Sequence, residues 1–342
     1  MPYRHRHGGH VNDSRLHPAD DRVALQINYQ PTDIRHAKHL LPHQLRALGT
    51  QVDEIVFNLD LHRSRGDFTI GWDEHLSPMR SYLEEVAADL PNARVVEVDY
   101  SPEARRRVND AYFGGADAPL KNFRGRPFYT SIEPWTTVSC DWLLHLDSDM
   151  LLGGGSSDWV AQAQQLIKDN STYVLASPLP GPPREDGTVL RQQDAQYVQP
   201  APAIIVPRMS WRIFLTHIPK FRAKVGPIPL LPAPLKGRIW TLREDNPPYE
   251  KIENIVGRQM QRHGLHRIDF LGSEPGLWSL HPPLRSEQFY AALPDLIARV
   301  ERGDVPPEQR GDYDMNDSMI DWSDARRTIR RERMRVMLSG RR

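Results

Sequence analysis

The chain has 342 residues, of which 39% are hydrophobic and 26% are charged, a composition typical of a soluble protein with one large domain or two modest ones. Lys plus Arg and Asp plus Glu both number 44, so the formal net charge of zero gives no indication of bulk nucleic-acid binding. Cys140 is the only cysteine, which excludes an internal disulfide framework and a cysteine-based zinc site, and favours a reducing compartment.

The start of the chain is polar. Residues 1–20 mix His, Gly, Asp and Arg without periodicity, and we expect them to form a disordered tail. They contain no apolar segment of the kind found in secretory signals, and no later run approaches the roughly 18 apolar residues of a membrane span. We therefore expect a cytoplasmic protein without a transmembrane segment.

Strand and helix patterns alternate after this tail. Apolar runs at 22–29, 52–60 and 93–100 predict strands, and a helix is expected after the turn signals Pro31 and Asp33. This alternation predicts βαβ units and a parallel sheet.

The remaining two thirds of the chain mix regular patterns with long irregular ones. Residues 101–128 are rich in Gly, Pro and Arg, and we expect a long loop over the carboxyl edge of the sheet. The Pro-rich residues 218–249 show no regular pattern over a length typical of lids and binding loops. Helical patterns occupy 158–170, 249–264 and much of the chain from about 286, and strand patterns occupy 141–152, 172–178, 202–207 and 265–271.

Two carboxylates stand where a buried strand is expected to end. The apolar segment DWLLHL leads to Asp147, Ser148 and Asp149, and MLL follows. Ligands of open α/β sheets bind beyond the carboxyl ends of the strands, and two acids at this spacing can both reach a hard cation such as Mg²⁺ or Mn²⁺. The alternative is a pair of solvated turn residues. The apolar flanks favour a buried setting, in which two like charges need a counter-ion.

The segment LLHLDSDMLL resembles the D-x-D signature of nucleotide-sugar-dependent glycosyltransferases of the GT-A fold (glycosyltransferase family 2-like). The resemblance covers residues 21–285 and implies an α/β, Rossmann-like domain with a mixed, mainly parallel sheet flanked by helices. A C-terminal helical extension at 286–342 follows it. The resemblance implies that Asp147, with Ser148 beside it, contacts the donor or a water of the metal, and that Asp149 binds Mn²⁺ or Mg²⁺ directly. The rest of the chain matches by order and spacing.

The same resemblance implies positions for the donor nucleotide. Nucleoside contacts fall on Asn28 and Tyr29 at the end of the first strand, with Asp33 nearby, and a contact to the base falls on Asp60 at the end of the second. Helix caps and turns are the alternative roles of these side chains.

Three further positions bear on the metal and the diphosphate. His281, in WSLHPP, matches a late histidine that completes the metal site in many of these enzymes, and a structural histidine is the alternative. Arg124 and Arg126 precede the D-x-D strand and are expected to reach diphosphate oxygens, because a guanidinium matches phosphate geometry; solvated loop cations are the alternative. Trp278 is a candidate for stacking on a sugar.

A catalytic base is needed if transfer inverts the sugar's configuration. In many members of the family the base belongs to an E-D pair at the start of a helix that runs to RRxG. The matching helix here is YEKIENIVGRQMQRHG, where Glu253 lies at the expected distance from Gly264 but is followed by Asn254. Glu250 shares its face, and Asp245 belongs to a literal E-D pair upstream. Inversion with Glu253 as base is favoured over a retaining mechanism, which needs no such base.

These features predict a metal-dependent hexosyltransferase that moves a sugar from a UDP- or GDP-sugar to an acceptor hydroxyl. One rival is a non-catalytic protein that binds a nucleotide sugar or a partner on the same scaffold. Another is a sugar-nucleotide pyrophosphorylase, which needs a Gly-rich phosphate loop where this chain has NYQPTD. The basic residues 324–342 alternate Arg with apolar residues, which suits a surface helix, a peripheral membrane contact or a homodimer contact.

Overall fold

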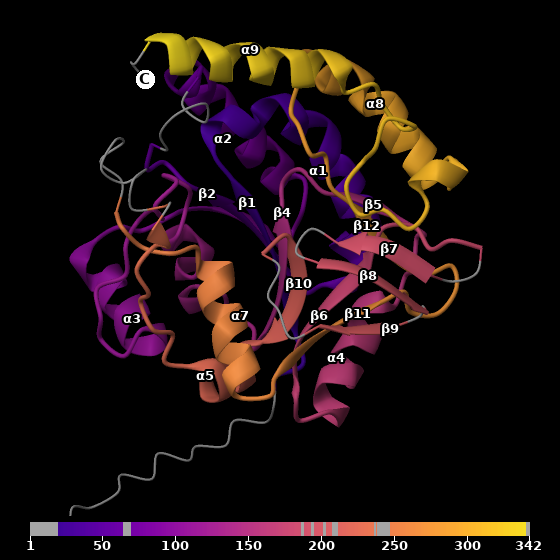
Figure 1. Ribbon diagram of the computed structural model, residues 1–342. Helices are drawn as coiled ribbons and strands as arrows, with labels where there is room; N and C mark the ends of the chain where they lie inside the picture. Colours follow the sequence, from indigo (N-terminus) through magenta and orange to yellow (C-terminus); the bar gives the residue numbers. More distant parts are fainter. Residues whose placement is uncertain are drawn as a thin grey trace, which may run out of the picture.

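The computed structural model describes residues 20–63, 70–185, 188–192, 195–200, 203–206, 211–235, 237 and 247–339. Within them, ten strands form one mixed sheet in the order β3-β2-β1-β4-β10-β6-β11-β9, and β12 joins the end of β6 and pairs with β5 (Figure 1). The strands of this sheet are β1 (Val23–Tyr29), β2 (Glu54–Leu59), β3 (Ala93–Glu97), β4 (Trp142–Asp147), β5 (Leu151–Gly153), β6 (Tyr173–Pro180), β9 (Ala203–Val206), β10 (Ile213–His217), β11 (His266–Phe270) and β12 (Trp278–Leu280). A separate hairpin consists of β7 (Thr188–Gln192) and β8 (Ala195–Pro200).

Helices cover both faces of the sheet. The α-helices are α1 (Ile34–Leu48), α2 (Trp72–Ala88), α3 (Pro102–Tyr112), α4 (Trp159–Asp169), α5 (Ile218–Val225), α7 (Ile252–Arg262), α8 (Glu287–Glu301) and α9 (Ser323–Ser339). Short 3-10 turns are η1 (Pro31–Asp33), η2 (Gly49–Gln51), η4 (Tyr129–Ser131), η5 (Glu133–Thr136) and η6 (Pro307–Gln309). The α/β class expected from the sequence is therefore confirmed.

The parallel order β3-β2-β1-β4 makes up one half of the sheet, as the alternation of strands and helices predicted. The other half departs from that expectation, because β10 runs antiparallel to both β4 and β6, and β9 runs antiparallel to β11. Between described strands of the sheet, five pairings are parallel and four are antiparallel. The prediction of a mainly parallel sheet is thus only partly correct. The connection from Val206 at the end of β9 to Ile213 at the start of β10 is too short for a crossover helix, so β10 does not repeat the βαβ geometry.

The period-two alternation of the strands divides the core into two layers. In β4, Trp142, Leu144 and Leu146 pack with α1 and α4, whereas Leu143 packs on the opposite face with α3, α5 and α7. Figure 1 shows α3, α5 and α7 together on that side of the sheet. Because both faces are covered, apolar side chains occupy both faces of the central strands, which explains their hydrophobic runs.

The prediction of a long loop over 101–128 is wrong for its first part, which forms helix α3. Ser101 caps it by accepting a hydrogen bond from the backbone N–H of Ala104 at 3.2 Å, and Pro102 stands at its first turn, where a missing N–H costs nothing. Val108 and Tyr112 are buried against the sheet. The many arginines of this segment hid the apolar face, and the irregular part begins only after Tyr112. Helix α5 likewise lies within the Pro-rich residues 218–249 and contributes Phe221 to the core.

The C-terminal segment packs on the same molecule. Helix α8 lies against α1 and β5, and it shares a buried cluster with Trp322, at the start of α9, and with Trp278 of β12. Among the described helices, none has the length and apolar character needed to cross a bilayer. The tail expected at residues 1–20 lies outside the described residues up to residue 19.

Candidate functional site

A cavity of about 240 Å³ opens at the carboxyl ends of β1 and β4. The start of α7 and the segment from Asn122 to Ser131 form its other walls. Eight residues that the sequence singled out line this cavity: Asn28, Tyr29, Asp33, Asp60, Arg126, Asp147, Ser148 and Glu253. Their convergence is the position expected for a ligand site in an open α/β sheet.

Strand register brings the first of these residues together. Asn28 pairs with Asp147 across the β1–β4 ladder and with Asn58 across the β1–β2 ladder. Its side-chain oxygen accepts a hydrogen bond from the amide of Asn58 at 2.8 Å. The hydroxyl of Tyr29 is buried and has no hydrogen-bond partner among the described residues. Because parallel strands end at one edge, residues far apart in sequence meet here.

Helix α1 holds the turn that carries the two acids. The side-chain amide of Gln44 donates to the carbonyl oxygens of Ser148 at 3.2 Å and Met150 at 3.0 Å. The Ser148 hydroxyl donates to Asp33 at 3.2 Å and lies 3.0 Å from Nε2 of His36. Burial lowers the pKa of His36 to about 4, so this ring is neutral at physiological pH. Ser148 therefore anchors the turn on α1.

The two carboxylates of the D-x-D sequence differ in exposure. The side chain of Asp147 is 32% exposed and lines the cavity, whereas that of Asp149 is 3% exposed and lies beneath it. Oδ1 of Asp149 is buried without a hydrogen-bond partner among the described residues. An ionised carboxylate in such a position needs positive charge close by.

Two arginines supply that charge. Arg285 donates from Nη2 to Asp149 at 2.7 Å and from Nη1 to Asp33 at 3.0 Å. Nη1 of Arg212 lies 3.6 Å from Asp147 and 3.7 Å from Asp149. Burial alone would raise the pKa of Asp149, but the charges of Arg285 and Arg212 outweigh it and hold that pKa well below its usual range.

His281 lies on the other side of Asp149. Its Nε2 is 3.9 Å from Oδ2 of Asp149, and its Nδ1 is 2.7 Å from Oδ1 of Asp314. A carboxylate at Nδ1 holds the proton there and leaves the Nε2 lone pair free, which is the arrangement usual for histidines that bind metals. The strand pairing of β5 with β12, in which Gly153 lies opposite Trp278, places His281 near the acidic turn.

The donor atoms around Asp149 fit a divalent cation. Two atoms that share an ion at about 2.1 Å lie between about 3 and 4.2 Å apart, and the separation of His281 from Asp149 falls in this range. Oδ1 of Asp149, which accepts no hydrogen bond from the described residues and lies 3.7 Å from Nη1 of Arg212, is a further ligand atom. Within the part of the chain that the structure describes, no group of three or more His, Cys, Asp and Glu is already arranged as a metal site. The two guanidinium groups stand beside the acids instead.

Asp60 is engaged by four donors. Its carboxylate accepts hydrogen bonds from the hydroxyls of Tyr100 and Thr130, from the backbone N–H of His62, and from the ammonium of Lys121 at 3.0 Å. Its side chain is only 3% exposed. Asp60 thus builds the cavity wall through a buried ion pair.

The candidate bases have different positions. Glu253 stands in the first turn of α7 and lines the cavity, as do its neighbours Lys251 and Asn254. Glu250 is buried, and its carboxylate accepts from the backbone N–H of Lys251 at 2.9 Å and from the amide of Asn254 at 3.1 Å. Glu250 therefore stabilises the start of the helix. Asp245 lies outside the described residues.

Two other sequence candidates do not line the cavity. Arg124 is exposed, and its guanidinium lies over the Phe123 ring with 5.5 Å to the ring centroid. Trp278 is 6% exposed and belongs to the core cluster around α8. Trp211 is the tryptophan in the cavity wall.

Sequence reasoning missed Arg212 and Arg285. Arg212 precedes β10, whose antiparallel pairing sets its start beside the end of β4, and the carbonyl of Arg212 accepts from the N–H of Asp147 at 2.7 Å. Arg285 follows β12 by a short loop, four residues after His281. The signal that would have led to Arg285 is its position in the sequence shortly after WSLHPP.

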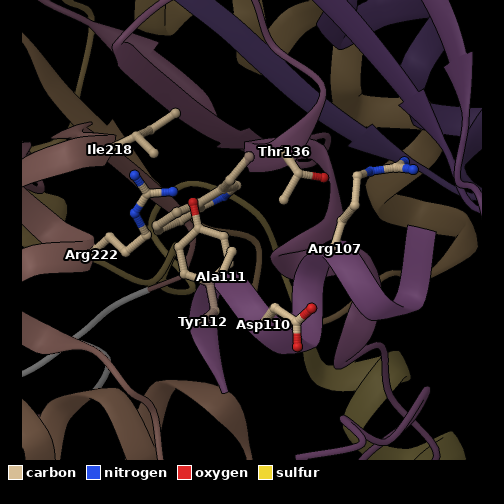
Figure 2. Close-up of a pocket in the computed structure, with 8 residues that line it drawn as sticks. Arg107, Asp110, Ala111, Tyr112, Thr136, Ile218 and Arg222 are labelled. Carbon is tan, nitrogen blue, oxygen red and sulfur yellow. The ribbon is translucent and has the colours of Figure 1, made fainter. Parts of the chain in front are cut away.

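A second hollow, of about 510 Å³, opens between α3, η5 and α5. In Figure 2, Arg107 and Arg222 lie on opposite sides of Tyr112. The hollow contains none of the predicted site residues, and its two guanidinium groups do not converge. The cavity beside Asp147 is therefore the candidate site.

No protein-family model matches this chain, and no curated protein matches it either. The functional interpretation thus depends on the chemistry of the cavity.

Proposed function

We propose that the protein is a metal-dependent glycosyltransferase of GT-A type, which moves a sugar from a UDP- or GDP-sugar to an acceptor hydroxyl. The observation that carries the proposal is the placement of Asp147 and Asp149 at the carboxyl edge of the sheet, next to a cavity with cationic walls. Carboxylates, guanidinium groups and a carboxylate-supported histidine together suit a metal-bound diphosphate.

Asp147, Asp149 and His281 are the residues that would hold Mn²⁺ or Mg²⁺ in this proposal. When bound, the cation would neutralise charge that develops on the diphosphate leaving group. Arg126 and Arg212 line the same cavity and add positive charge for phosphate oxygens. Asn28 and Tyr29 form the part of the wall proposed for the nucleoside.

Melting temperatures with UDP or GDP, each with and without Mn²⁺, test the proposal most directly. We expect one nucleotide to stabilise the protein when Mn²⁺ is present and much less without it, because binding to the native state raises its stability. Stabilisation by neither nucleotide would contradict the proposal. Stabilisation without any sugar transfer or donor hydrolysis would indicate the non-catalytic rival.

Glu253 is the proposed base. Glu253→Gln should lower the turnover number of sugar transfer about a hundredfold, because the amide cannot accept the acceptor's proton. The melting temperature and the donor KM should stay near wild type, because Glu253 is a partly exposed residue on the cavity wall. Steady-state kinetics with saturating Mn²⁺ measure these constants.

Glu250→Gln is the matched comparison, three residues earlier. This variant should lower the melting temperature because it weakens the cap of α7, while turnover is retained. Full turnover in Glu253→Gln would remove Glu253 from the reaction and favour a retaining mechanism.

Asp314 is expected to act on the metal through His281. Asp314→Asn should raise the dissociation constant of Mn²⁺ by about 10- to 100-fold, because the carboxylate that orients the imidazole is lost. Electron paramagnetic resonance of free Mn²⁺ during a titration measures this constant. The exposed Asp304 provides a control variant, Asp304→Asn, which should bind Mn²⁺ as the wild type does. If Asp314→Asn and Asp304→Asn had equal dissociation constants for Mn²⁺, His281 would not be a ligand of the metal.

A further inference from the structure

The guanidinium groups of Arg212 and Arg285 contact the same carboxylates that are proposed to hold the divalent cation. Arg285 reaches Asp149 at 2.7 Å, and Arg212 lies within 3.7 Å of both Asp147 and Asp149. Arg285 holds Oδ2 of Asp149 and Arg212 lies beside Oδ1, so a guanidinium stands next to each oxygen of this carboxylate. Arginine and metal therefore compete for these acids.

The charges of the cluster balance in a way that favours exchange. Asp33, Asp147 and Asp149 carry three negative charges, and Arg212 and Arg285 carry two positive ones, so the cluster has a formal charge of −1. A divalent cation alone would change this to +1 within a half-buried site, which is costly. A diphosphate supplies the missing negative charge. Metal and diphosphate thus suit the site better together than separately.

We propose that Arg212 and Arg285 are internal counter-ions that occupy the acids when the site is empty and turn to the diphosphate when metal and donor bind. This inference rests on the proposed function. Both side chains line the cavity, and they are 18% and 30% exposed, so each guanidinium has room on the cavity side. A planar guanidinium binds phosphate oxygens in the same forked geometry that it uses for carboxylates.

The two arginines are held differently. Arg285 bridges Asp33 and Asp149 through two hydrogen bonds, whereas the ion-pair distances of Arg212 are 3.6 and 3.7 Å. Because Arg285 retains Asp33 as a partner, it can release Asp149 and stay anchored beside the cavity.

Exchange predicts effects of opposite sign for metal and nucleotide. Removal of one guanidinium removes a competitor, so Mn²⁺ alone should bind about tenfold more tightly to Arg212→Met and to Arg285→Met than to the wild type. UDP or GDP, whichever the wild type prefers, should bind about tenfold more weakly to both variants at saturating Mn²⁺. A residue that only supports the fold would weaken both affinities.

The experiment compares Mn²⁺ titrations, followed by electron paramagnetic resonance, with calorimetric nucleotide titrations at saturating Mn²⁺. Arg302→Met, at the exposed end of α8, is the control and should match the wild type in both. Arg212→Lys keeps the charge but loses the fork, so it should bind Mn²⁺ nearly as the wild type does and bind the nucleotide more weakly. Circular dichroism verifies that each variant is folded.

The outcomes separate this inference from the proposed function. If the wild type binds neither Mn²⁺ nor a nucleotide with Mn²⁺, the proposed function fails and the inference fails with it. If the wild type binds both, but neither folded methionine variant binds Mn²⁺ more tightly, the exchange alone is overturned. If Arg285→Met does not fold, the Mn²⁺ and nucleotide affinities of Arg212→Met and Arg212→Lys still decide whether the exchange takes place.

Discussion

Asp149→Asn should abolish Mn²⁺-dependent sugar transfer, with a loss in turnover number of at least about a thousandfold. Its carboxylate lies under the cavity between Arg285 and His281, and an amide neither balances those charges nor binds a hard cation well. Loss of the cation leaves the developing charge on the leaving group without stabilisation worth several kcal/mol. Radiolabelled sugar transfer, or release of UDP or GDP, measures the effect.

Asparagine is a better replacement than alanine at this position. Alanine would leave Nη2 of Arg285 without its hydrogen-bond acceptor and open space in a buried turn, so lost activity would be confounded with lost stability. Asp295→Asn, on the exposed side of α8, is the matched control and should retain wild-type turnover. Mn²⁺-dependent transfer at a normal rate by Asp149→Asn would refute the proposed function.

Glu133→Gln should stabilise the protein at pH 8 by on the order of 3 kcal/mol and leave its stability near pH 4.5 almost unchanged. Glu133, in η5, is fully buried, and neither carboxylate oxygen has a hydrogen-bond partner among the described residues. Burial, together with the charge of Asp99, raises the pKa of Glu133 from 4.5 to about 7. The folded protein thus holds a proton that the unfolded chain releases at lower pH.

The sign follows from where the proton is bound. Between about pH 4.5 and 7 the folded state retains the proton of Glu133 and the unfolded state loses it, so the free energy of unfolding decreases as pH rises. Above pH 7 both states are ionised at this position, and its effect is constant. Glutamine mimics the neutral acid at every pH, so this decrease should be absent from Glu133→Gln.

Urea unfolding at intervals from pH 4.5 to 8 measures the difference between the two curves. Glu84→Gln, on the exposed surface of α2, should follow the wild type throughout. Parallel curves for the wild type and Glu133→Gln would show that the buried carboxylate ionises as an ordinary one does.

Sequence patterns sufficed for the residues whose position depends on parallel strands. Asn28 and Asp147 meet because neighbouring parallel strands end at one edge, and apolar runs followed by polar residues reveal such ends. Arg212 and Arg285 were missed because their positions depend on the antiparallel return of β10 and on the loop after β12. Neither the return of β10 nor the loop after β12 leaves a periodic signal in the sequence. Tertiary pairing, rather than local preference, decides where these two charges lie.

Helix α3 and Glu250 show the same limit at shorter range. The apolar face of α3 consists of a few positions among arginines, so composition suggested a loop where Ser101 and Pro102 in fact start a helix. Glu250 and Glu253 share a helical face in the sequence, but only Glu253 lines the cavity, because Glu250 precedes the first turn and bonds to it. Periodicity does not show which acid turns back to cap the helix.

The pairing of β5 with β12 determines the spacing of the proposed cation ligands. Leu151 lies opposite Leu280, so the residues that precede β5 and follow β12 leave the same end of a short antiparallel ladder. Gly153 closes the other end, where a side chain would collide with the ring of Trp278. Backbone hydrogen bonds thus fix the distance between Asp149 and His281. Under the proposed function, changes in the surrounding loops would alter the substrate, while this three-residue ladder would keep Asp149 and His281 at the same separation.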